Sequence, residues 1–158
     1  MNRYFFFAFV ASSMALFSAC DDDDDDSFTV FGGSYTTSNE QLAGPPVVQI
    51  RITGLGDMEN LGPGKFVAYS TQNLTPPPPF TMAGIATSSF DDHDDVFYTS
   101  FNGTITPNGD GTNTIVVNHV IRGGTGRFEN ATGSYTGTSK VDLTQPTNTL
   151  NVEGRIKY

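Results

Sequence analysis

Apolar side chains alternate with polar ones along short segments of this chain, and this period of two constrains its fold more than any other feature. The clearest case is the last segment, whose apolar face is formed by Leu150, Val152, Gly154, Ile156 and Tyr158. The residues between them are polar or charged, as in a strand with one face on a core and the other in solvent. Six earlier segments have the same extended character, at residues 47–53, 66–70, 80–90, 96–106, 112–122 and 135–143.

Glycine and proline separate these segments. The chain has 17 glycines and nine prolines, and strong helix formers are scarce outside the N-terminal stretch. Such punctuation is typical of short strands joined by turns. We therefore predict an all-β fold of seven or eight strands, a small antiparallel up-and-down barrel of about eight strands. A β-sandwich is the alternative, because strands with one apolar face are common to both architectures.

The N-terminus has the pattern of an export signal. The basic start at Arg3 is followed by an uncharged apolar run from Tyr4 to Ala19, which ends in small residues. Sixteen residues are fewer than the roughly 20 that a membrane-spanning helix needs. The sequence therefore predicts a signal peptide at residues 1–19.

Cys20 follows this run directly and is the only cysteine of the chain. It cannot form an internal disulfide, which leaves a free thiol or a modified one. The stretch Leu16-Phe17-Ser18-Ala19-Cys20 resembles the lipobox of bacterial lipoproteins. The resemblance implies that the mature chain begins at Cys20, carries lipid on this residue and is anchored to a membrane by its acyl chains.

Six aspartates come next, and their like charges keep the segment solvated, so we expect a disordered acidic tether at residues 20–27. The run consists of Asp21, Asp22, Asp23, Asp24, Asp25 and Asp26. It resembles the acidic signal that directs some Gram-negative lipoproteins to the cell surface. An aspartate at this place resembles an inner-membrane retention signal in other lineages, but the length of the run favours export. We predict an outer membrane lipoprotein of the cell envelope that is exposed on the surface.

The remaining residues, 28–158, have the size of one domain. Of the 17 acidic residues 11 lie outside the aspartate run, against seven lysines and arginines that follow the signal peptide. These basic residues are scattered singly, whereas nucleic-acid binding needs them clustered on one face. We therefore expect no nucleic-acid partner. The sequence makes no prediction of the oligomeric state.

A glycine-rich segment, residues 121–134, is the most specific motif of this domain. Its glycines permit a sharp bend between two strands, and its phenylalanine is placed to plug one end of a barrel. The residues concerned are Gly123, Gly124, Gly126, Phe128 and Gly133. The segment resembles the GGTGRF-x-x-ATG signature of barrels related to allene oxide cyclase and the dirigent proteins, and residues 54–62 resemble a weakened form of their earlier glycine turn. This resemblance implies a calycin-like barrel of eight strands.

Four residues are predicted to face the lumen of the barrel by their phase along the strands: Phe97, Phe101, His119 and Tyr135. They line a ligand site or fill a solid core. We predict no catalytic residue, cofactor or metal. His93, within an acidic cluster, is interpreted as part of a solvated loop rather than a cation site, and residues 108–113 as a hairpin turn rather than a calcium loop.

The favoured function is a non-enzymatic binding or structural module of the cell envelope. Its expected partners are the membrane, through the N-terminal lipid, and a small apolar ligand or a glycan. The alternative is a cyclase-like or isomerase-like enzyme that acts on a small apolar substrate in the lumen.

Overall fold

A computed structural model of the chain describes residues 27–90 and 94–158. Within these ranges no helix is long and apolar enough to cross a membrane. The described residues form eight strands and one short 3-10 helix. Their bounds are β1 Thr29–Ala43, β2 Val47–Met58, β3 Gly62–Asn73, β4 Phe80–Phe90, β5 Asp95–Pro107, β6 Thr112–Thr125, η1 Gly126–Phe128, β7 Thr132–Asp142 and β8 Asn148–Lys157.

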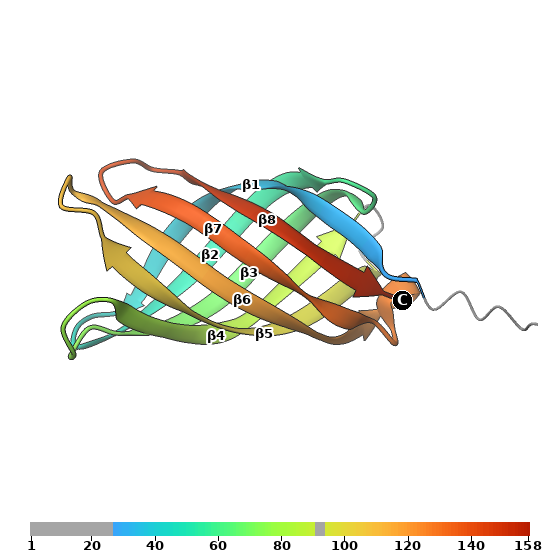
Figure 1. Cartoon of the computed structure of the whole chain (residues 1–158), viewed down its shortest axis with the longest axis horizontal. Coiled ribbons are helices and arrows are strands. Elements are labelled where there is room, and N and C mark those ends of the chain that lie inside the picture. Colours follow the sequence, from blue (N-terminus) through green and yellow to red (C-terminus); the bar gives the residue numbers. More distant parts are fainter. Residues whose placement is uncertain (1–26, 91–93) are drawn as a thin grey trace, which may run out of the picture.

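The strands form a closed antiparallel barrel in which each strand pairs with the next and β1 pairs with β8 (Figure 1). The first and last strands meet in register, with Phe31 opposite Gly154 and Tyr35 opposite Leu150. Strands β2, β4, β6 and β8 finish at the end that carries η1, which we call the plugged end. Strands β1, β3, β5 and β7 finish at the other end, which we call the open end.

The prediction of an all-β barrel of about eight antiparallel strands is therefore confirmed, and the sandwich alternative is wrong because the pairing of β1 with β8 closes the sheet. The hairpin predicted from residues 96–106 and 112–122 is confirmed by the pairing of β5 with β6. One strand was not predicted at all. Strand β1 has glycines at positions 32 and 33 and a polar second half, so only Phe31 and Tyr35 carry its apolar pattern.

Two segments expected to be turns are largely strand. Residues 54–58 continue β2, and the turn is confined to residues 59–61, where Asn60 has a φ of 65°. Gly123 and Gly124 continue β6, so the bend begins only at Gly126. Gly123 and Gly126 do have positive φ, at 96° and 58°. Gly124 is required for another reason, since a Cβ there would collide with the carbonyl oxygen of Val96.

Aromatic side chains fill the plugged half of the barrel. Phe128 of η1 is fully buried, and its ring centroid lies 5.7 Å from that of Phe90 and 5.4 Å from that of Phe97. Arg127 covers this cluster from outside, with its guanidinium 4.7 Å from the Phe128 ring centroid, an ion pair to Asp95 and a hydrogen bond to the carbonyl oxygen of Leu61. These side chains fill the interior of the barrel next to η1.

Candidate functional site

An apolar pocket occupies the interior of the barrel on the side of the open end. Its free volume, measured as the space open to the centres of water molecules, is about 60 Å³. The space has room for a few water molecules or for one narrow apolar group. None of its lining side chains is an acid, a lysine or an arginine. They are Thr37, Asn39, Ile50, Ile52, Phe66, Ala68, Gln72, Met82, Phe101, Ile115, Val117, His119, Ser139, Val141 and Leu150.

The alternation of the strands accounts for this lining. Ile50 and Ile52 project from the same face of β2, and Ile115, Val117 and His119 from the same face of β6. Pocket side chains thus come from every strand, and those from the same strand are an even number of residues apart, as inward-pointing positions are. The open end remains hollow because no equivalent of Phe128 enters it.

His119 is the most buried polar side chain of the pocket. It is only 2% exposed, and its Nδ1 lies 2.9 Å from the hydroxyl oxygen of Thr99 on β5. Its ring stacks on Tyr135 at a centroid distance of 4.2 Å and an interplanar angle of 11°. On the other side, the Phe101 ring lies at 4.8 Å. The register explains this sandwich, since Phe101, His119 and Tyr135 are direct partners on three neighbouring strands.

Burial changes the acid–base properties of this cluster. The loss of solvent lowers the pKa of His119 to about 3, because the imidazolium form cannot be hydrated in an apolar interior. The same cause raises the pKa of Tyr35 to about 12, and raises the pKa of Tyr135 as well. At neutral pH the interior therefore holds a neutral imidazole beside two neutral phenols.

The neutral state of His119 predicts a loss of stability in acid. In the unfolded chain this imidazole binds a proton near pH 6.5, whereas in the folded barrel it does so only near pH 3. Between these values the unfolded state binds more protons, so the free energy of unfolding falls as pH falls, by up to about 1.4 kcal/mol per pH unit. Urea unfolding at several pH values measures this slope.

The matched control is His119→Asn, which keeps a hydrogen-bonding atom near the Nδ1 position and does not titrate. We expect its unfolding free energy to change less steeply than that of the wild type between pH 6 and pH 3.5. Parallel curves for the two proteins would contradict the assignment of a neutral buried His119.

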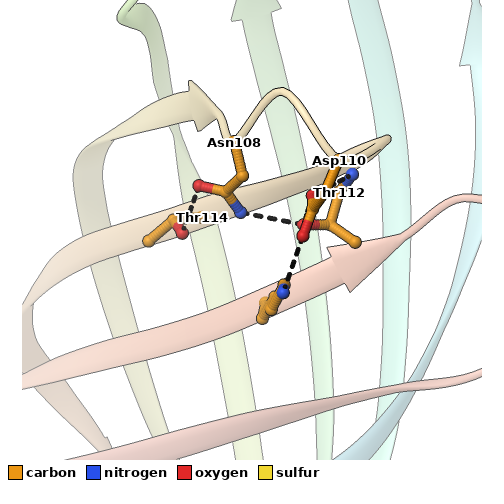
Figure 2. A network of polar contacts seen from close by, with 5 residues as sticks. Asn108, Asp110, Thr112 and Thr114 are labelled. Atoms are coloured by element: carbon orange, nitrogen blue, oxygen red, sulfur yellow. Dashed lines mark hydrogen bonds and ion pairs between the residues drawn. The ribbon is translucent and has the colours of Figure 1, made fainter.

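The turn between β5 and β6 lies at the open end and is held by side-chain hydrogen bonds (Figure 2). The Asp110 carboxylate accepts hydrogen bonds from the backbone amide and the hydroxyl of Thr112, and Lys140 Nζ lies 3.0 Å from it. These bonds hold the pKa of Asp110 well below its usual range. The side-chain nitrogen of Asn108 donates a hydrogen bond to the hydroxyl of Thr112, and its side-chain oxygen accepts one from the hydroxyl of Thr114. The arrangement is the hairpin turn that the sequence indicated. The carboxylate oxygens of Asp110 are already bonded to Thr112 and Lys140.

The structure places the predicted lumen residues in two groups. Phe101 and His119 line the pocket, whereas Phe97 and Tyr135 are buried in the packed part of the core. Sequence reasoning did not identify the pocket walls as a site, although the alternation along their strands indicated that Ile50, Ile115 and Leu150 point into the barrel. It also missed Thr99 as the partner of His119. Among the glycine-rich segment residues, Phe128 lies in the plug, and Gly133 has a φ of 142° in β7.

Other predictions fall on the part of the chain that the structure does not describe. Cys20, the run Asp21–Asp26 and His93 all lie outside the described residues. Among the residues that are described, no three His, Cys, Asp or Glu side chains come together in a group that could hold a metal ion.

Comparison with known proteins gives no match to a protein-family model, to a curated protein or to a solved structure.

Proposed function

We propose that this protein is a lipid-anchored protein of the outer membrane, exposed on the cell surface, whose barrel is a non-enzymatic binding module for a small apolar group. The apolar pocket at the open end carries the binding part of the proposal. The lipobox-like sequence before Cys20 and the aspartates after it support the location.

The size of the pocket favours binding over catalysis. Sites for drug-sized ligands usually measure about 300–1,000 Å³, whereas this pocket offers about 60 Å³ to water centres. Such a space accepts the end of a narrow apolar molecule and leaves the rest of it outside the barrel. A reaction that reshapes an entire substrate inside the lumen would need more room.

Binding can be tested by NMR on isoleucine methyl groups with pentanol as the probe. We expect the methyl resonances of Ile50, Ile52 and Ile115 to shift, because these side chains line the pocket. Ile85 on the outer wall and Ile156 in the plugged half provide internal controls in the same spectrum. Equal shifts at all five residues, or none at the three pocket residues, would contradict a binding site at the open end.

Location can be tested by protease treatment of intact cells. We expect the wild-type protein to be degraded, and a variant with all six aspartates Asp21–Asp26 changed to asparagine to be protected, since asparagine keeps the size and removes the charge. Immunoblots with a periplasmic protein as the control measure this. Protection of the wild type would contradict surface exposure.

One observation favours the enzymatic alternative. The pocket contains a neutral histidine hydrogen-bonded to Thr99, and a neutral imidazole can polarise a substrate oxygen by hydrogen bonding, although its lowered pKa makes it a weak base at neutral pH. An isomerase acting on a small apolar substrate would use this group. Chemical analysis of ligands recovered after incubation with the protein separates the two functions, because a binding module returns its ligand unchanged.

A further inference from the structure

The fold gathers three basic residues that are scattered singly in the sequence. Arg122 of β6 is the register partner of Thr132 on β7, and Thr132 is in turn the partner of Lys157 on β8. Arg155 lies two residues before Lys157, on the same face of the strand. The three basic residues face the outside of the barrel near the plugged end, and we call them the cationic patch.

The members of the cationic patch are close enough to act on one partner. Neighbouring strands lie about 4.8 Å apart, so the Cα atoms of Arg122 and Lys157 are about 10 Å apart, and those of Arg155 and Lys157 about 7 Å. Between them β7 contributes the hydroxyl residues Thr132 and Ser134, which add no charge. Such a group of like charges on one wall favours a partner that carries several negative charges.

The chain enters the barrel beside this patch. Thr29, the first residue of β1, pairs with Ile156, which lies between Arg155 and Lys157. Phe28 precedes Thr29, and the guanidinium of Arg155 lies 4.9 Å from its ring centroid. This cation–π contact holds the entering chain against the outer wall of β8.

A strongly anionic segment comes just before Phe28. The six aspartates of the run Asp21–Asp26 lie two to seven residues before it. An extended chain covers at most about 3.6 Å per residue, so Asp26 lies within about 7 Å of Phe28 and Asp21 within about 25 Å. Every carboxylate of the run can therefore reach the cationic patch. Because the run is covalently attached, its effective concentration there is on the order of millimolar.

We propose that the run Asp21–Asp26 docks on the cationic patch of its own barrel. The attraction comes from several exposed ion pairs, each weak by itself, and the patch also reduces the repulsion among the aspartates. An anionic lipid headgroup offers the same charge, but no covalent link fixes its concentration at the patch. The docked run involves the outer wall and not the pocket, so its failure would leave the proposed binding function unaffected.

Cys20 permits a direct test, because it is the only cysteine and adjoins the run. A nitroxide spin label on Cys20, in the unlipidated chain that begins at this residue, broadens the amide NMR resonances of the residues that it approaches. We expect strong broadening at Thr132 and Ser134 in about 20 mM NaCl, and at least about threefold less in about 1 M NaCl, where the Debye length falls to about 3 Å. Equal broadening at both salt concentrations would overturn the docking.

Two triple variants separate the patch from the overall charge. Changing the three patch residues to glutamine is expected to abolish the salt-dependent broadening. The control combines Arg51→Gln, Lys65→Gln and Lys140→Gln, which removes the same charge outside the patch and should retain most of the broadening. Equal loss in the two variants would show that the run responds to the net charge of the barrel, which contradicts docking at the patch.

A variant of the run itself leaves the barrel untouched. With all six aspartates changed to asparagine, the label on Cys20 should broaden Thr132 and Ser134 no more in low salt than in high salt. Broadening that stays salt-dependent in this variant would exclude the aspartates as its cause.

Vesicles of phosphatidylcholine and phosphatidylglycerol in equal parts distinguish the run from an anionic lipid as the occupant. We expect these vesicles to leave the broadening by the Cys20 label in place, since the run already covers the patch. If the vesicles shift the wild-type resonances of the patch while the label leaves them sharp, the patch is a headgroup site and the docking of the run is wrong.

Discussion

Replacing Phe128 with alanine is expected to lower the free energy of unfolding of this barrel by about 3–5 kcal/mol. The side chain has no exposed surface and contacts three other aromatic rings, those of Phe90, Phe97 and Tyr158. Its removal leaves a cavity that η1 cannot close, because the neighbouring strands are fixed by their pairing. Urea unfolding followed by circular dichroism measures the change.

The matched control for this prediction is Phe28→Ala. Phe28 lies just before β1, next to Arg155 of β8, and keeps 43% of its surface exposed. Its loss removes little buried area and one exposed cation–π contact, so we expect a change of about 1 kcal/mol or less. Similar losses for the two variants would show that the ring of Phe128 does not close the barrel in the way described.

Adding one methyl group at Gly84 is the second change with a large expected effect. Gly84 of β4 faces the interior, and a Cβ there would collide with the carbonyl oxygen of Tyr69 and lie 2.6 Å from Cζ of Phe101. A backbone carbonyl within a strand pair cannot rotate away as a side chain does. We therefore expect Gly84→Ala to lower the free energy of unfolding by about 3 kcal/mol, at the upper end for overpacked cores.

Gly32→Ala is the corresponding control in a strand of the same barrel. A Cβ at Gly32 would lie 3.5 Å from the nearest atom, the carbonyl oxygen of Val152, which is ordinary contact. Since alanine also restricts the unfolded chain, we expect stability to be unchanged or raised by up to about 1 kcal/mol. Urea unfolding compares the two variants. Similar stability of both would contradict the close approach at Gly84.

The sequence predicted most strands because their apolar residues alternate, as Leu150, Val152 and Ile156 do in β8. It did not predict β1, in which glycine and polar residues interrupt that alternation after Phe31. Closure of the barrel could not be derived from periodicity either. It depends on the pairing of β1 with β8, two strands that are more than a hundred residues apart in the chain.

The candidate site was predictable only in part. The phase of His119 within β6 indicated an inward side chain, and the structure has it buried. Its contact with Thr99 depends on the register of β5 against β6, which shifts between Phe97 and Thr99. An irregularity of this kind changes which side chains meet across the strands, and the sequence alone does not reveal it. The position of the pocket could not be predicted either, because the sequence does not show which end of the barrel Phe128 fills.

An even number of up-and-down strands returns the chain to the end from which it started. Thr29 and Lys157 therefore both lie at the plugged end, and the pocket opens at the opposite one. The nine peptide units from Cys20 to Thr29 span at most about 32 Å, roughly the height of this barrel, whose tilted strands have 10 to 15 residues. If Cys20 is the lipid anchor, as we propose, the anchor joins the barrel at the end opposite the mouth, so a ligand dissolved in water can reach the mouth without passing the anchor.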